Sequence, residues 1–560
     1  MNEGKDPLKD PAQKNLNSGS AADIEPGVLA NIGAMLDAPR RGIGPDIVIV
    51  VSSSEEGASF WQKRLTCSDD ARGSGSIVKP SSIILSVSES NWNGPAGNAL
   101  GTINAFYLAG IKAAGMGLFR PSSKGFQDVL KSFLSFSAGK SVFMYHTAGQ
   151  GTRLFPLTAA EYNSKSRIKL PGVINVDGKE EPMTVLEASI RASSIYAPSR
   201  EDRLSVFWGD QLFLNEFDAA SERKHHVEIF AQPAKLDDTI KSYGTIVPME
   251  SGDLLLREKL DVARIKAMLP EGTDTVFRSA GSFSITFDFF EQLALAEIEA
   301  VTKREGSLNT DNDWWQALTS TLDEYADISR DIGVNGQGAK ERWKKTHEAW
   351  EKTSFRRKSL KMLGIKNTGE NSLWIDLGRN SCFFENILGL TGQDKRAQEL
   401  RAFFQMKVTD RGRGAPGEMS WRNSAVAGAL IGEGKLINCV VVASEIGEID
   451  AEDSVIIGSS VTKLNSSGAL CYNVVSPRED LKRGDILANV FHPDKGRITM
   501  RTHVSRDGRA DWRENTKLGA NKFSYRELTE LVAGVPEDQA RTIRQNEETL
   551  LKKGKDKNGN

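Results

Sequence analysis

The clearest chemical signature in this sequence lies at residues 145–158, which read Tyr-His-Thr-Ala-Gly-Gln-Gly-Thr-Arg-Leu-Phe-Pro-Leu-Thr. An apolar run at 142–146 leads into the glycine turn 149–151, and Arg153 follows the turn. Glycines let backbone N–H groups approach an anion, and arginine offers a planar fork to phosphate oxygens. The third glycine of a dinucleotide fingerprint and the Gly-Lys-Ser/Thr of a Walker loop are both missing. The segment therefore predicts a phosphate-binding loop of another kind.

Two aspartates follow predicted strands further along the chain. Asp210 comes after the run 204–208, and Asp376 lies in the run 372–377. Carboxylate oxygens are ligands for Mg²⁺, which also keeps waters and binds phosphate oxygens. Open α/β folds bind ligands at the carboxyl edge of the sheet, where we expect both aspartates to meet. Taken alone, an aspartate after a strand is more often a turn or helix-cap residue, so a magnesium site at this edge depends on the motifs around the two aspartates.

Residues 148–158 resemble the signature loop of sugar-1-phosphate nucleotidyltransferases (sugar-nucleotide pyrophosphorylases), a pattern of roughly Gly-Gly-x-Gly-Thr-Arg-Leu-x-Pro-Leu-Thr. Every fixed position matches except the first, where Ala148 replaces glycine. Segments similar to the family's other motifs follow in the family's order, at 166–171, 207–211, 243–245 with 257–259, 279–283 and 374–378. Leu170 and Leu260 depart from the pattern, because one interrupts a Lys-Pro pair and the other replaces a proline. The resemblance covers about residues 140–390, with a repeat at 420–470.

The resemblance implies a set of site residues. The nucleotide-binding residues it implies are Ala148, Gly149, Gln150, Gly151, Thr152 and Arg153. Those for the sugar phosphate are Gly244, Glu258, Lys259 and Ser282. The catalytic set is Arg153, Lys169, Asp210 and Asp376, of which the two aspartates hold the metal. Lys165 and Arg167 compete with Lys169 for its role, and the glycines at 94, 97 and 101 either contact the nucleotide or permit a tight turn.

The implied reaction joins a sugar 1-phosphate to a nucleoside triphosphate and releases pyrophosphate, with Mg²⁺ as cofactor. The attacking phosphate has a second pKa near 6, so it is ionised at neutral pH and needs no general base. One alternative is a non-catalytic regulatory subunit of the same fold that binds nucleotide or sugar phosphate. Another is a hexapeptide acyltransferase, but the histidine such enzymes use is missing between residues 348 and 491.

Strands alternating with helices predict the fold that must position these residues. We expect an α/β class, with a Rossmann-like mixed sheet followed by a C-terminal left-handed β-helix-like domain. The expected domains are a weakly ordered segment at 1–40, a nucleotidyltransferase domain at 41–395, a β-helix and β-rich domain at 415–535, and a charged tail at 540–560. The second domain contains an N-terminal extension at 41–140, loosely like the fucose-1-phosphate guanylyltransferase branch, and a helical insertion at 290–365. Apolar residues six apart, from Ile431 to Val461, suggest the β-helix.

Composition limits the partners and the compartment. The chain has 560 residues, with 72 Lys and Arg against 74 Asp and Glu, a net charge of −2. This balance argues against nucleic acid and anionic membrane as partners. The longest apolar runs are five residues, and the N-terminus lacks the core of a signal peptide. Four scattered cysteines suit a reducing compartment, so we expect a cytoplasmic protein, with a homo-oligomer through the β-helix left open.

Overall fold

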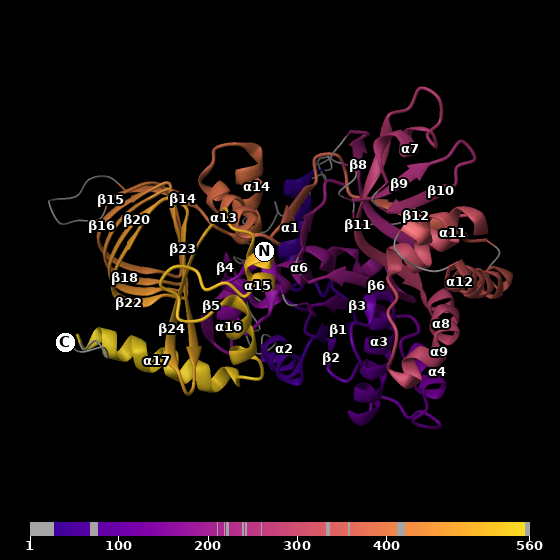
Figure 1. Ribbon diagram of the computed structural model, residues 1–560, viewed down its shortest axis with the longest axis horizontal. Helices are drawn as coiled ribbons and strands as arrows, with labels where there is room; N and C mark the ends of the chain where they lie inside the picture. The colour runs from indigo at the N-terminus through magenta and orange to yellow at the C-terminus, as the bar shows by residue number, and fades with distance from the viewer. Residues whose placement is uncertain are drawn as a thin grey trace, which may run out of the picture.

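The computed structural model describes most of the chain. The described residues are 27–67, 77–149, 151–209, 211–217, 219, 223–237, 240, 243–258, 260–331, 336–356, 359–411 and 420–554, with backbone alone at 331, 356, 376 and 411. An α/β part and a curled sheet of strands lie side by side along the long axis (Figure 1). Within these residues, no helix has both the length and the apolar character needed to cross a membrane.

A nine-stranded mixed sheet forms the centre of the α/β part. Its strands are β1 (Ile47–Ser52), β2 (Ile83–Ser88), β3 (Ser141–His146), β6 (Arg203–Trp208), β8 (His225–Lys235), β9 (Gly244–Pro248), β10 (Leu254–Glu258), β11 (Thr275–Thr286) and β12 (Lys361–Asn367). The order is β10-β9-β11-β6-β3-β1-β2, with β8 pairing with β11 and β12. Strands β2, β1, β3 and β6 are parallel, whereas β11 runs antiparallel to β6. The predicted mixed α/β sheet is confirmed.

Alternating side chains of the parallel strands enter two different cores. Ile47, Ile49 and Val51 of β1 pack under α3 (Gly97–Gly115), α4 (Phe126–Phe136) and α8 (Phe287–Ala296). Val48 and Val50 face the opposite side, under α1 (Val28–Asp37), α2 (Glu55–Cys67) and α6 (Val185–Ser193). Both faces of the sheet are thus covered by helices, as an all-apolar strand requires.

The 41–140 extension and the 290–365 insertion both belong to this sheet or its cover. The extension contributes β1 and β2, which continue the parallel row beyond β3. The insertion is helical as expected, and its elements are α9 (Ile298–Lys303), the π-helix η6 (Thr310–Trp315), α10 (Gln316–Leu318), α11 (Leu322–Asp331) and α12 (Gly336–Arg356). It ends earlier than predicted, because residues from Lys361 onward form strand β12.

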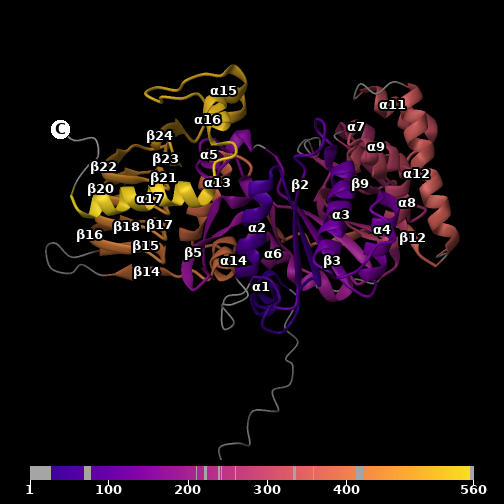
Figure 2. The ribbon, with the colours of Figure 1, turned by 90° about the horizontal axis from the view of Figure 1, so that it is seen from below.

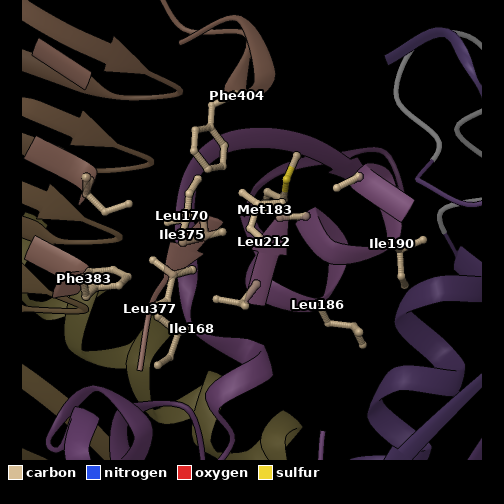
Figure 3. Packing of buried hydrophobic residues seen from close by; sticks show 14 of the residues in the cluster. Ile168, Leu170, Met183, Leu186, Ile190, Leu212, Ile375, Leu377, Phe383 and Phe404 are labelled. Atoms are coloured by element: carbon tan, nitrogen blue, oxygen red, sulfur yellow. The ribbon is translucent and has the colours of Figure 1, made fainter. Parts of the chain in front are cut away.

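Shorter elements connect this sheet to the curled sheet. Two ribbons are β4 (Lys169–Val176) with β5 (Lys179–Thr184), and β7 (Gln211–Leu214) with β13 (Leu373–Asp376). The remaining helices of the α/β part are η2 (Thr152–Leu154), α5 (Leu157–Ala160), η3 (Lys165–Arg167), η4 (Ser194–Ser199), α13 (Asn380–Leu388), η7 (Gly389–Thr391) and α14 (Lys395–Phe404), with α7 (Val262–Lys266) at the end away from the curled sheet (Figure 1). Figure 3 shows side chains of β4, β5, α6, β7, β13, α13 and α14 gathered in one apolar cluster.

The curled sheet is a coil in which successive strands alternate between two rows. One row holds β16 (Leu430–Ile437), β18 (Glu445–Glu452), β20 (Ser460–Ser467) and β22 (Val475–Leu481). The other holds β17 (Val440–Val442), β19 (Val455–Ile457), β21 (Leu470–Tyr472) and β23 (Asp485–His492). Strand β15 (Ser420–Ala427) pairs with both rows, β14 (Val408–Arg411) pairs with β15, and β24 (Gly496–His503) closes the far end.

The repeat of this coil is 15 residues, so the predicted spacing of six is wrong. Ile431 pairs with Ile446 and Ile446 with Val461, while Val440 pairs with Val455 and Val455 with Leu470. The two corners of each turn have positive φ at the same spacing. They are Asn423, Asn438, Asp453 and Gly468 at one corner, and Gly428, Ala443, Gly458 and Asn473 at the other. Short polar residues and glycine adopt this conformation most readily. The left-handed sense of the coil stays a prediction.

The row of short strands joins the coil to the α/β part. Ile457 of β19 belongs to the same apolar cluster as Leu170 of β4 and Phe383 of α13. Its chain neighbour Ile456 faces the opposite way, into the interior of the coil with Val441 and Leu464. Strand β4 contacts β15, β17 and β19. The two parts therefore share one continuous hydrophobic core.

The C-terminal residues pack against the coil and do not form the charged tail expected from residue 540. After α15 (Gly508–Glu514) and α16 (Tyr525–Val532), α17 (Glu537–Lys552) crosses the coil (Figure 2). Helix α17 contacts β22, β23 and β24, and its Ala540 is fully buried. Residues 555–560 lie outside the described part.

Candidate functional site

A cavity of about 540 Å³ lies at the carboxyl ends of the parallel strands. Its lining residues are Glu89, Pro95, Ala96, Gly97, Asn98, His146, Thr147, Ala148, Gly149, Lys165, Ser166, Trp208, Gly209 and Gln211. They follow β2, β3 and β6 in the chain, apart from Lys165 and Ser166 of η3. Ligands of open α/β sheets bind at this edge. The structure thus brings Ala148 and Gly149 of the predicted loop into the largest opening along the carboxyl edge.

The glycine loop is held by close contacts that only glycine permits. Gly149 and Gly151 have φ of 135° and 58°. A Cβ built on Gly151 would lie 2.3 Å from Cγ of Lys165, so the lysine stem packs directly on the loop backbone. The N–H of Gly209 donates to the carbonyl oxygen of His146 at 2.9 Å, and this hydrogen bond joins the ends of β3 and β6. A Cβ on Gly209 would lie 3.0 Å from the same oxygen. Gln150 lies outside the described residues.

Lys165 therefore lies next to the glycine loop, whereas Lys169 does not. The Lys169 ammonium donates to Oδ1 of Asn473 at 2.5 Å and lies 3.2 Å from a carboxylate oxygen of Glu161. It lines a separate cavity of about 340 Å³ between β4, the coil and α17. Burial lowers the pKa of Lys169, and the Glu161 carboxylate opposes that shift. Among the described residues, Lys169 is brought neither to the cavity that Ala148 and Gly149 line nor to Arg153.

A buried group of three side chains lies at the base of the cavity. The Thr102 hydroxyl donates to the carbonyl oxygen of Asn98 at 2.7 Å, so its oxygen accepts the 2.9 Å bond from Nε2 of His146. Nδ1 of His146 is then unprotonated, and it lies 3.9 Å from Oε1 of Glu89. Burial lowers the pKa of His146 to about 4 and raises the pKa of Glu89 to about 7. His146 is therefore neutral at physiological pH.

A line of close contacts extends from the cavity toward the edge strand β10. The indole of Trp208 lines the cavity, and its Nε1 lies 2.5 Å from where Gly281 would carry a Cβ. Farther along, a Cβ on Gly244 would lie 3.4 Å from Cβ of Ser279 and 2.6 Å from Oε2 of Glu258. Strand β11 has a register shift between Ser279 and Phe283, which bends it at this point. Gly244 and Glu258 are thus brought together as expected.

Aromatic rings lie beside this second region. Tyr243 and Trp374 have ring centroids 5.2 Å apart, and the guanidinium carbon of Arg278 lies 5.7 Å from the Tyr243 ring. Trp374 also contacts Phe213 at 5.4 Å. Such a surface suits a sugar, because a sugar ring presents apolar C–H faces between its hydroxyl groups. Lys259 lies outside the described residues.

Two other predicted residues are placed away from the cavity lining. The Arg153 side chain is half-buried, on the η2 turn that packs against α15, and it is not part of the lining. Ser282 is 1% exposed, and within the described residues its hydroxyl has no hydrogen-bond partner. It borders a small space of about 20 Å³ behind Trp208. Thr152 precedes Arg153 on the same turn.

Of the two predicted metal ligands, the structure describes only the backbone of Asp376, in the ribbon formed by β7 and β13. Asp376 pairs with Gln211 in the β7–β13 ladder, and Gln211 directly follows Asp210. Asp210 and the side chain of Asp376 lie outside the described residues. Elsewhere in the described residues, no group of three or more His, Cys, Asp or Glu side chains could hold a metal ion. By its chemistry, a pair of aspartates is a donor set that suits Mg²⁺, which takes few protein oxygens.

Sequence reasoning missed Glu89 and placed no role on Asn98. Glu89 follows strand 83–88 directly, so the same rule that selected Asp210 would have selected it. Trp208 lies within the segment 207–211 of the family resemblance, which gave it no role. Lys165 was weighed as a competitor of Lys169, and sequence spacing alone could not decide between them.

Comparisons with known proteins do not identify the function of this site. A scan against protein-family models found no match, and neither did a search of curated proteins. One solved structure that aligns is of a Bacillus anthracis protein provisionally named a glucose-1-phosphate thymidylyltransferase, in complex with a sucrose. The alignment covers 60% of this chain and 92% of that one, at 10% identity and a TM-score of 0.17. A likeness at that TM-score carries no argument about fold or function.

Proposed function

We propose that the protein is a sugar-1-phosphate nucleotidyltransferase that makes a nucleotide-sugar and pyrophosphate in a magnesium-dependent reaction. The observation that carries the proposal is the cavity at the ends of β3 and β6, into which the glycine loop opens. A glycine loop with an adjacent lysine opens onto the main cavity, and a second region at Gly244 and Glu258 connects to it through Trp208. Two substrates, one on each side of Trp208, would meet at the ends of β3 and β6.

The chemistry asks the protein mainly to position and neutralise charge. A phosphate oxygen of the sugar 1-phosphate attacks the α-phosphorus, the bond to the bridging oxygen breaks, and pyrophosphate leaves. Both substrates are polyanions, so their repulsion must be offset. In this proposal the backbone of the 149–151 loop and the Lys165 ammonium bind the triphosphate, and Glu258 accepts a hydroxyl hydrogen of the sugar. We assign to Lys165 the role that the sequence gave to Lys169.

The proposal also includes a magnesium ion bound by two aspartates. Asp210 and Asp376 would hold Mg²⁺ near the triphosphate. Bound there, the ion would draw negative charge from the phosphate oxygens. The backbone of Asp376 pairs with Gln211, the residue that follows Asp210 in the chain, and this pairing supports a shared role for the two aspartates.

A screen of nucleoside triphosphates against sugar 1-phosphates tests the function. We expect pyrophosphate release from one triphosphate only when a matching sugar 1-phosphate and magnesium are both present. The reverse reaction should consume pyrophosphate and the nucleotide-sugar. If triphosphates and sugar phosphates bind but no pair across a broad panel releases pyrophosphate, the regulatory-subunit alternative replaces this proposal.

A further inference from the structure

The far wall of the main cavity is formed by residues 89–98, which belong to the N-terminal extension. Glu89 follows β2 directly, and its side chain is 21% exposed where it borders the cavity. Across the described residues, no side chain or backbone N–H donates a hydrogen bond to its carboxylate. Nδ1 of His146 lies 3.9 Å from Oε1 of Glu89, beyond hydrogen-bond distance. The Glu89 carboxylate therefore offers the cavity two acceptor oxygens that no donor among the described residues occupies.

The structure holds Glu89 in this position and leaves room for it. A Cβ on Gly101 would lie 2.6 Å from Oε1 of Glu89, so glycine at this position makes space for the carboxylate. Trp92 donates from Nε1 to the carbonyl oxygen of Gly306 at 3.1 Å. Leu308 exchanges backbone hydrogen bonds of 2.9 Å with Ala96 and Ala99. The insertion thus holds residues 89–98 in place through these hydrogen bonds. A polar side chain on a segment held in this way is preorganised for binding.

A carboxylate without donors selects among nucleobases by their hydrogen-bonding edges. Guanine presents two adjacent donors, N1–H and the exocyclic N2 amino group, which match the two oxygens of one carboxylate. Adenine and cytosine place an acceptor nitrogen next to their amino group, and uracil and thymine place carbonyl oxygens on both sides of N3–H. Each of those acceptors would repel the carboxylate. The ring of Trp208, 5.4 Å from His146, offers a face on which a base could stack.

We propose that residues 89–98 form the nucleobase subsite, and that Glu89 accepts the N1–H and N2–H groups of guanine. The substrate class is then a guanine nucleoside triphosphate. This inference rests on the proposed function for the fate of the nucleotide, but its test uses binding and not turnover.

The test measures the equilibrium affinity of the full-length protein for GTP, ITP, ATP, UTP, CTP and dTTP with magnesium, by calorimetry. We expect GTP to bind at least tenfold more tightly than any other triphosphate. ITP lacks only the N2 amino group, so it should bind about tenfold more weakly than GTP. In Glu89→Gln, where one acceptor becomes a donor, GTP should weaken about 30- to 100-fold and the GTP–ITP difference should disappear. Equal affinities for GTP and ITP in the native protein would overturn the inference without any variant.

The pH dependence of binding adds a readout that a structural role would not change. Burial holds the pKa of Glu89 near 7, and only the ionised carboxylate accepts both bonds. GTP affinity should be full above pH 7 and fall about tenfold per unit below it. The other titratable side chains that line the cavity with Glu89 are His146 on β3 and Lys165 on η3. Glu89→Gln should bind GTP with no such slope, and a slope that persists would remove Glu89 from the subsite.

Different results would overturn the guanine subsite and the transferase function. If pyrophosphate is released with a triphosphate other than GTP, the guanine assignment is overturned and the transferase stands. If GTP binds through Glu89 but no sugar phosphate gives turnover, the subsite stands and the transferase is overturned.

Discussion

At the scale of residues, two lysines four positions apart face different cavities. The Lys165 stem packs on Gly151 at the phosphate-binding loop, whereas the Lys169 ammonium is held by Asn473 and Glu161. We expect Lys165→Met to lower kcat by about 10²- to 10³-fold, the usual cost of losing a preorganised charge at a reacting phosphate. Its thermal stability should be nearly unchanged. Initial rates with magnesium and both substrates measure the effect.

Lys169→Met is the matched control. It removes the same charge and keeps a similar stem, but it leaves the buried Glu161 carboxylate without its cation. We expect a loss of about 1–3 kcal/mol in the free energy of unfolding, with kcat within a few fold of native. Urea unfolding and the same rate measurement separate the two variants. A large loss of kcat in Lys169→Met with native stability would return the catalytic role to Lys169.

The part of the site that sequence could predict is the part carried by local motifs. Gly149 and Gly151 have positive φ, which favours glycine, and Gly149 lines the cavity. Glu89 directly follows a strand, as Asp210 does in the sequence, but no motif surrounds it, and its environment comes from Gly101 and His146, which the fold brings to it. The roles of Asp210 and Lys259 stay predictions.

At the scale of elements, the start of α3 depends on contact with the insertion. Gly97 has φ +69°, and a Cβ there would lie 2.2 Å from the carbonyl oxygen of Leu308. Gly94 has a similar φ of +82°, but no atom lies within 4 Å of its would-be Cβ. Gly94→Ala should cost only the strain of positive φ, about 1–2 kcal/mol. Gly97→Ala must also displace the Leu308 backbone.

We therefore expect Gly97→Ala to lose at least about 2 kcal/mol more than Gly94→Ala, since overpacking adds about 1–3 kcal/mol to the strain. Because residues 95–98 line the cavity, it should also raise KM for the triphosphate about tenfold and leave KM for the sugar phosphate alone. Urea midpoints and the two KM values test this. Equal losses in the two variants would show that the insertion does not brace the wall.

Element types were predictable where the apolar pattern is continuous, as in β1, β3 and β6. The 15-residue repeat of the coil could not be predicted from the apolar pattern. Residues that face the interior of the coil and residues that face the α/β part are both buried and apolar, so they hide the spacing of either set. Ile456 and Ile457 are adjacent and each 0% exposed. The clearer signal was the polar corner, where Asn423, Asn438 and Asp453 recur every 15 residues.

At the scale of the whole molecule, the coil and the α/β part are joined by polar contacts as well as by their shared core. The Tyr472 hydroxyl donates to the Glu161 carboxylate at 2.7 Å and accepts from the backbone N–H of Lys169 at 2.9 Å. Glu161 and Lys169 lie on either side of η3, the turn that carries Lys165. The coil therefore supports the segment that presents the site's lysine, and we expect the two parts to unfold together.

Substitutions at two neighbouring isoleucines test this coupling. Ile456→Ala and Ile457→Ala remove the same side chain, so each should cost about 2–5 kcal/mol. Ile456 faces the interior of the coil, whereas Ile457 belongs to the core shared with β4. Hydrogen exchange should therefore rise in residues 169–176 for Ile457→Ala and stay native there for Ile456→Ala, under conditions where both remain folded. On heating, each variant should still show one calorimetric transition, because a shared core makes the unfolding of both parts cooperative. Two separated transitions, or native exchange in β4 for both variants, would mean that the coil is an independent unit and that its contacts with β4 do not stabilise the site.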